Sequence, residues 1–228
     1  MVGSSRVPRI VLWPRVVSRW HIGSNWCVAS RVLSTISLLR PIVDPNVMRR
    51  DPESEGVVLV FDTPTSAFLE DVAPELVRAS IPFAVSIATA HVRMRAPRRA
   101  RTATAITWSE LEDLVGLGVT VAVRGHDVDD LAVLPDELAF GQLAHARGTV
   151  RRFLGIEPWL VCDPTTSSRL PIARIARELG FEAGVVRLNG TNSANDPLRR
   201  PALVPRPWQS AHAIARRVRS DAASGTGR

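Results

Sequence analysis

The sequence contains no lysine and no tyrosine, so all 29 of its basic residues other than histidine are arginines. Uniform use of arginine is typical of a GC-rich coding bias and is weak support for phosphate recognition. The chain also lacks the aromatic motifs that stack on RNA bases and the Gly-rich loops that bind phosphates. These absences disfavour a nucleic-acid-binding or nucleotide-binding domain.

Cysteines and long apolar stretches are also scarce. The two cysteines, Cys27 and Cys162, are far apart and form no CxxC pair, so neither a disulfide framework nor a structural zinc site is indicated. Arg31 and Arg40 interrupt the most hydrophobic stretch before it reaches the roughly 18 residues of a membrane helix. The N-terminus has no clear signal-peptide pattern. We therefore expect a cytoplasmic protein and leave its oligomeric state open.

The net charge of +7 comes from the first part of the chain. Residues 1–50 hold eight arginines and one acid, Asp44, whereas the rest is close to neutral. This part shows no sustained hydrophobic period and ends in an acidic, turn-rich stretch. We predict a basic, irregular extension over 1–55, one domain over 56–220 and a flexible tail over 221–228. A separate interpretation makes residues 1–52 a basic module that binds nucleic acid or an anionic surface.

From Val57 onward, short apolar runs alternate with segments of helical period. This pattern is typical of parallel strands that helices cover on both faces, and it predicts an α/β fold. The predicted strands are Val57–Phe61, Phe83–Ala88, Val119–Val123, Trp159–Val161 and Gly184–Arg187.

Helices are predicted between these strands. A capping box, in which Thr107 is followed three residues later by Glu110, marks the start of one of them. The predicted apolar faces include Leu69, Val72, Leu76 and Val77 in the first helix, and Ile214 and Val218 in the last, which we place at about 209–219.

Polar residues follow four of the predicted strands. They are Asp62-Thr63, then 124–127 (Arg-Gly-His-Asp), 162–164 (Cys-Asp-Pro) and 187–189 (Arg-Leu-Asn). Ligands of parallel α/β sheets bind at the carboxyl ends of the strands. We therefore expect the functional site where these segments meet.

A collinear series of segments resembles the NodB-type polysaccharide deacetylases of carbohydrate esterase family 4. The series comprises Phe61-Asp62 after a strand, Thr107-Trp-Ser-Glu at a helix start, Gly118-Val-Thr-Val-Ala-Val-Arg124, and Val204-Pro-Arg206. The resemblance extends over roughly residues 56–219. It implies a deviant parallel (β/α) barrel, and in the family that barrel carries a metal-dependent hydrolase that removes acetyl groups from N-acetylated sugars.

Measured against that resemblance, most metal-ligand positions are changed. The first family motif, Thr-Phe-Asp-Asp-Gly, here reads Val60-Phe-Asp-Thr-Pro. Asp62 keeps the position of the catalytic base, and Thr63 replaces a metal ligand. Arg124 and Val128 stand where the family has two histidine ligands, and neither side chain can bind a metal. We therefore expect no cofactor.

The remaining motifs are only partly kept. The family's Arg-x-Pro-x-Gly corresponds to Cys162-Asp-Pro-Thr-Thr, so we predict Asp163 and Pro164, together with Arg124, as substrate-binding residues. The family's final histidine, a general acid, has no clear counterpart, and His212 is the nearest residue. We interpret Cys162 as a buried, inert thiol.

Two interpretations of the site are open. In the first, the guanidinium of Arg124 either only neutralises Asp62 as an internal ion pair or also holds a sugar carboxylate or phosphate. In the second, a shift of the second motif by two residues would place His126 and Asp130 four apart. With Asp62 they would form a set that accepts a divalent ion such as zinc.

The sequence predicts a non-catalytic pseudoenzyme that binds a glycan, an anionic polymer or a protein partner. The alternative is an active hydrolase of N-acetylated sugars that uses Asp62 in a rearranged site. No transmembrane segment is expected.

Overall fold

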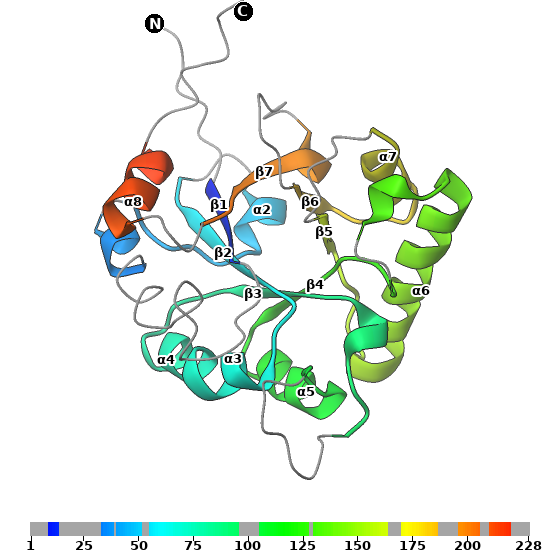
Figure 1. Ribbon diagram of the computed structural model, residues 1–228, viewed down its shortest axis with the longest axis horizontal. Coiled ribbons are helices and arrows are strands. Elements are labelled where there is room, and N and C mark those ends of the chain that lie inside the picture. Colours follow the sequence, from blue (N-terminus) through cyan, green and yellow to red (C-terminus); the bar gives the residue numbers. More distant parts are fainter. Residues whose placement is uncertain are drawn as a thin grey trace, which may run out of the picture.

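A computed structural model of the chain shows seven parallel strands closed into a barrel, with helices around the outside (Figure 1). It describes residues 9–13, 33–38, 40–51, 55–95, 105–127, 130–163, 170–186, 196–205 and 210–219. The strands are β1 (Arg9–Trp13), β2 (Val57–Asp62), β3 (Ala84–Ile87), β4 (Thr120–Val123), β5 (Leu160–Asp163), β6 (Ala183–Val186) and β7 (Arg200–Leu203).

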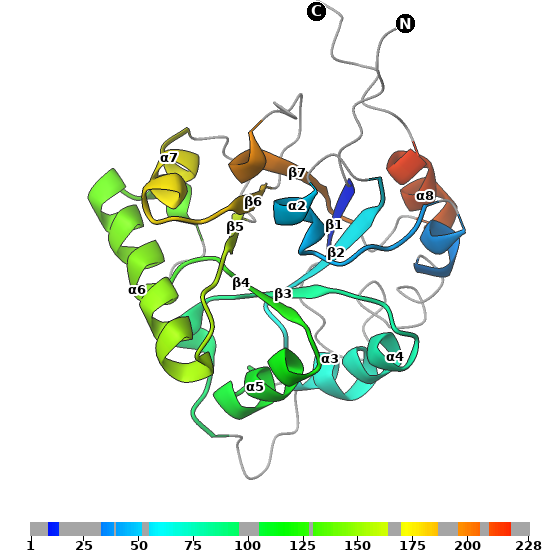
Figure 2. The same cartoon turned by 180° about the vertical axis from the view of Figure 1, so that it is seen from behind.

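The view from behind shows the same ring of helices around the strands (Figure 2). No helix in the described ranges is long and apolar enough to cross a membrane. The α-helices are α2 (Val47–Arg50), α3 (Ser66–Asp71), α4 (Ala73–Arg78), α5 (Trp108–Gly116), α6 (Asp136–Leu154), α7 (Leu170–Glu178) and α8 (Ala211–Arg219), and residues 33–37 are also helical. The short 3-10 helices are η1 (Thr89–His91), η2 (Leu131–Val133) and η3 (Pro197–Arg199).

The deviant parallel barrel predicted from the sequence is confirmed. The five predicted strands correspond to β2 through β6, with ends that differ by one or two residues. One end of the last predicted strand, Arg187, lies outside the described residues. The two strands that the sequence did not reveal, β1 and β7, pair with each other and close the barrel.

Strand β1 lies within residues 1–55, where the sequence predicts an irregular extension. All five of its residues are in register with β2, from Arg9 opposite Val57 to Trp13 opposite Phe61. The run is short, and prolines flank it on both sides in the sequence. It therefore lacks the periodicity by which longer strands are recognised, and only its partners identify it as a strand.

The segment 41–51, which contains α2, covers the end of the barrel at which the strands begin. The amide of Val43 donates to the carbonyl of Val57, and the amide of Val57 donates to that of Pro41. Met48 is buried, and Val43 and Val47 pack against the inner cluster of the barrel. Two parts of residues 1–55, where the sequence predicts a basic, irregular extension, thus pack into the barrel.

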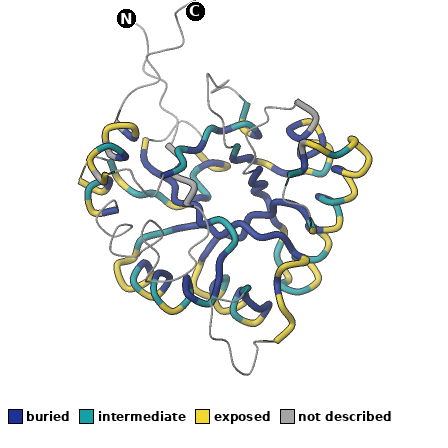
Figure 3. Tube along the Cα trace, viewed as in Figure 1, coloured by how far each residue is buried: buried dark blue, intermediate teal, exposed yellow. Residues whose placement is uncertain are grey.

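Buried side chains form two layers on opposite faces of the strands. Along β2, Val58 and Val60 belong to the cluster inside the barrel, whereas Val57, Leu59 and Phe61 pack against the helices. This alternation is the period of two that a strand imposes on its side chains. Figure 3 shows the buried strands in the middle and the exposed sides of the helices at the rim.

Most of the predicted helical features are present. The capping box of Thr107 and Glu110 forms at the start of α5, and Ile214 and Val218 of α8 are buried, as predicted. The helix predicted around Leu69–Val77 is instead two helices, α3 and α4, with Pro74 at the start of the second. Proline lacks the amide that would continue the first helix. Val77, predicted inward, is 37% exposed.

We expect Gly184→Ala to destabilise the protein by roughly 3 kcal/mol, because an added Cβ on β6 would overlap the backbone of Leu198. The matched control is Gly148→Ala in α6, where a Cβ meets nothing within 4 Å and alanine is the better helix former. That change should stabilise by about 0.5–1 kcal/mol. Urea unfolding of both variants measures the difference, and equal stabilities would contradict the predicted overlap.

Candidate functional site

The strand alternation brings four polar side chains to the inside of the barrel. Val60 of β2, Ala84 of β3, Ala122 of β4 and Leu160 of β5 all belong to the inner cluster. The residues two positions further along each strand face the same way. They lie toward the carboxyl ends of the strands, where parallel barrels hold their functional groups, and they are Asp62, Ser86, Arg124 and Cys162.

Arg124 and Asp62 form an ion pair at this end of the barrel. Arg124 Nη1 donates to Asp62 Oδ2 at 3.1 Å, and its distance to Oδ1 is 3.3 Å. The same Nη1 donates to the hydroxyl of Thr63 at 2.9 Å. The side chains are only 10% (Arg124) and 14% (Asp62) exposed, so solvent screens the pair weakly. The contact that the sequence suggested between these two residues is therefore present.

Thr63 holds a backbone conformation that β-branched residues rarely adopt. Its φ angle is +49°, in the left-handed region, and its amide donates to the carbonyl of Ser86 at 2.8 Å. Such a conformation costs on the order of 1–3 kcal/mol and persists where surrounding contacts fix it. Here the hydrogen bonds to Ser86 and Arg124 fix Thr63 at the end of β2.

Burial raises the pKa of Asp62 above its ordinary value, although Arg124, Ser86 and Thr63 each act to lower it. Desolvation therefore outweighs the ion pair. Ser86 is fully buried, and its hydroxyl oxygen makes no hydrogen bond of normal geometry within the described structure. It lies close enough to Asp62 and Cys162 to lower the pKa of both groups.

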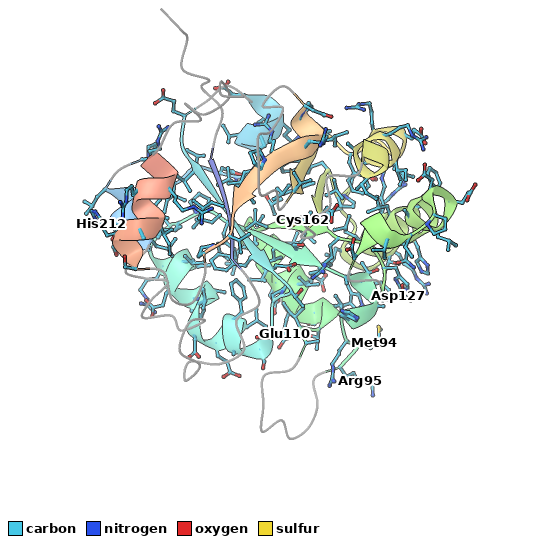
Figure 4. All side chains as sticks on the ribbon, turned by 45° about the horizontal axis from the view of Figure 1, so that its top comes forward. Met94, Arg95, Glu110, Asp127, Cys162 and His212 are labelled. Carbon is cyan, nitrogen blue, oxygen red and sulfur yellow. The ribbon has the colours of Figure 1, made fainter. Side chains whose placement is uncertain are left out.

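Cys162 is a buried, protonated thiol. It is fully buried, and burial raises its pKa far above the ordinary range, with the charge of Asp62 as the next cause. Figure 4 shows it among the strands in the middle of the barrel. The prediction that Cys162 is buried is confirmed, and a thiol held in its protonated form is a poor nucleophile.

Of the other two predicted substrate-binding residues, Asp163 and Pro164, the structure describes only Asp163. Asp163 is 4% exposed. It lies two residues after Val161, whose side chain packs against the helices, so both side chains face the same side of the strand. Its side chain therefore lies on the helix side of β5 rather than inside the barrel with Asp62. Pro164 lies outside the described residues.

The alternative metal set is not brought together. Asp62, His126 and Asp130 are all described, yet the described residues contain no group of three or more His, Cys, Asp or Glu side chains that could hold a metal ion. His126 is turned toward Thr89 instead, and its Nδ1 lies 2.8 Å from the hydroxyl of that residue. The described residues therefore do not show the ligand set that a shift of the motif by two residues would create.

The residues around Asp62, where the resemblance puts the metal, also do not fit the divalent ion that it implies. A cation beside Asp62 would meet the guanidinium of Arg124, which already occupies both carboxylate oxygens. Thr63 offers only a neutral hydroxyl, and it accepts a hydrogen bond from the same guanidinium. Divalent ions in proteins are held by anionic or neutral donors with free lone pairs, and arginine has none. Val128 lies outside the described residues.

His212, the nearest sequence counterpart of the family's general acid, is exposed on α8, and Figure 4 shows it at the periphery, away from Cys162. Sequence reasoning missed Ser86, which could have been found because it lies two residues after Ala84 in a predicted strand. It also missed the contact between His126 and His145, whose rings stack. Those histidines are 19 positions apart, and no sequence signal joins them.

No family model matches the sequence, and no curated protein matches it. Solved structures do match its fold. The deacetylase PplD of Streptococcus pyogenes, solved with acetate, is 14% identical with a TM-score of 0.76, over 94% of this chain and 98% of that one. IcaB of Ammonifex degensii is 16% identical with a TM-score of 0.74, over 96% and 98%.

A third similar structure is BC0361, a polysaccharide deacetylase of Bacillus cereus. It is 8% identical with a TM-score of 0.71, over 93% of this chain and 69% of that one. Identities this low describe the shared backbone and leave the chemistry of each site to its own residues. The closed order of parallel strands and these similarities agree, and the chain has the NodB-type polysaccharide deacetylase fold.

Proposed function

We propose that this protein is a non-catalytic glycan-binding protein that uses the strand ends of a deacetylase barrel. The observation that carries the proposal is the ion pair in which Arg124 occupies both oxygens of Asp62. The sequence resemblance gives Asp62 the position of the catalytic base, and a base whose oxygens both accept from a fixed guanidinium is poorly placed to take a proton from water. The structures with a similar fold include a polysaccharide deacetylase and a de-N-acetylase, which supports a carbohydrate ligand.

The charges of the site favour an uncharged sugar over an anionic one. Arg124 and Asp62 neutralise each other, and both are largely buried. An added carboxylate or phosphate would therefore have to compete with Asp62 for the guanidinium. A neutral N-acetyl group suits the pair better, because its carbonyl accepts from an arginine and its amide N–H donates to a carboxylate.

Isothermal titration with a neutral N-acetylglucosamine hexamer, in the presence of a chelator, tests the proposal. We expect binding that the chelator leaves intact and that changes little between low and high salt, because no net charge is neutralised on binding. The double variant Asp62→Asn/Arg124→Met should weaken it by about tenfold or more, since one to two hydrogen bonds to charged groups are lost. Changing both partners avoids an unpaired buried charge.

The matched control is Glu75→Gln/Arg78→Met, which removes an exposed ion pair on α4 and should leave binding unchanged. Two outcomes would contradict the proposal. Acetate released from the hexamer in a metal-dependent reaction would indicate the hydrolase. Tight, strongly salt-dependent binding of a polyanion, with none of the neutral hexamer, would indicate an electrostatic partner.

A further inference from the structure

Three histidines from three elements gather beside the strand ends, outside the site around Asp62. His126 follows β4, His91 belongs to η1 and His145 to α6. The rings of His126 and His145 are stacked, with centroids 3.9 Å apart and planes 9° from parallel. His126 is half-buried, whereas His91 and His145 are exposed.

Hydrogen bonds tie the same three elements together around His126. Its Nδ1 lies 2.8 Å from the hydroxyl of Thr89, and its carbonyl accepts from the amide of Ala90 at 2.8 Å. On the other side, the Gln142 side-chain oxygen accepts from the amides of His126 and Asp127, both at 3.0 Å. The loop after β4, described over residues 124–127, is thereby joined to η1 and to α6.

We propose that this cluster is an acid-sensitive clasp, which joins the loop after β4 to η1 and α6 at neutral pH and loosens in mild acid. The proposal concerns groups other than the ion pair and does not rest on glycan binding. With His126 neutral and its proton on Nε2, the Thr89 hydroxyl donates to Nδ1, and the uncharged ring of His126 stacks on His145 without charge repulsion. Protonation of Nδ1 makes it a donor, so that hydrogen bond must reverse, and it places a cation against the ring of His145.

The charged and titratable neighbours agree with this direction. Burial lowers the pKa of His126 below its ordinary value, and His145 and His91 lower it further, while Asp127 alone raises it. The folded loop thus favours neutral His126. A histidine whose pKa is lower in the closed form stabilises that form fully above its free pKa of about 6.5, and this stability is lost as the pH falls below that value.

Loosening of the clasp would affect the carboxyl end of β4, next to Arg124. His126 lies two residues beyond Arg124, with Gly125 between them, and the amide of Arg124 donates to Ile87 of β3. Loosening of the clasp would free the loop just after this anchor. The position of this loop, and therefore access to the carboxyl ends of the strands, would then depend on pH.

Amide hydrogen exchange on the full chain at about pH 7.5 and pH 5.5, corrected for intrinsic exchange, tests the clasp. We expect protection of the Ala90, His126 and Asp127 amides to fall at least about threefold more than that of Ile81, whose amide bonds to Leu76 within a distant turn. His126→Asn keeps an acceptor but cannot titrate, so its Ala90 and Asp127 amides should show no such difference. In His145→Gln the ring of His126 should titrate at a higher pH by NMR.

Either of two results would overturn the clasp. One is equal loss of protection at Ile81, which would show global unfolding rather than local loosening. The other is an unchanged pH response in His126→Asn, which would assign the effect to other groups.

Discussion

Deletion of residues 1–13 is expected to abolish cooperative folding, because it removes the strand that closes the barrel. Strand β1 pairs along its whole length with β2 and at Ile10 and Val11 with β7. Without it, both neighbours become sheet edges and the inner cluster, which includes Ile10, opens to water. Circular dichroism during heating should show no sharp transition, and dye binding should report exposed apolar surface.

A graded version of the same test keeps the chain length. Ile10 is 2% exposed, so Ile10→Ala should cost about 2–4 kcal/mol of unfolding free energy. The control in the same N-terminal part is Leu38→Ala, where the side chain is 85% exposed and the change should be within about 0.5 kcal/mol. A deletion variant that melts like the full chain would show that residues 1–13 are an appendage after all.

The second large effect is expected at the ion pair. Arg124→Met should destabilise the protein by about 3 kcal/mol near neutral pH, because it leaves the carboxylate of Asp62 buried without its cation. The exposed pair of Arg78 and Glu75 provides the control, and Arg78→Met should cause no measurable loss. Guanidinium unfolding curves of the three proteins give the comparison.

The pH dependence of this loss has a defined sign. Burial already raises the pKa of Asp62 in the folded protein, and loss of Arg124 removes the strongest opposing cause. A carboxyl whose folded pKa is raised costs stability once the pH exceeds its unfolded pKa of about 3.9, and costs nothing below it. The penalty of Arg124→Met should therefore grow as the pH rises from 4 to 7. A penalty independent of pH would assign the loss to packing rather than to charge.

The middle of the barrel was predictable from the sequence, and its closure was not. Strands β2 to β6 consist mostly of apolar residues, which is the pattern of strands buried on both faces. Strand β7 reads Arg-Pro-Ala-Leu and pairs at only two positions with each neighbour, so it carries no strand signal of its own. Both unpredicted strands depend on partners that are distant in the sequence.

The site was predictable to a similar extent. Asp62 and Arg124 each follow an apolar run, and the parallel arrangement brings the ends of β2 and β4 close enough for contact across β3. The stack of His126 on His145 depends on how α6 packs beside the loop after β4, and the sequence contains no pattern for that. The direction of Asp163 required the alternation of β5, which the two-residue difference in the predicted strand end had obscured.

This chain shares its fold with the similar structures, but a shared fold does not assign their chemistry to the site that holds the ion pair. The NodB-type fold supplies a ring of strand ends, and the residues on those ends decide what the ring does. Here the guanidinium of Arg124 contacts both oxygens of Asp62, the residue that the sequence resemblance puts at the base position. Building a metal site at Asp62 would require removal of Arg124 as well as addition of ligands.

The central claim is that Arg124, rather than a metal ion, lies beside Asp62 and that the site is not catalytic. The most direct test is a titration of zinc into the metal-free protein, with acetate release from the N-acetylglucosamine hexamer followed in the same samples. We predict no saturable zinc site that depends on Asp62 and no acetate above the protein-free rate. About one zinc ion per chain, lost in Asp62→Asn together with acetate release, would contradict the proposal and make the protein an active deacetylase.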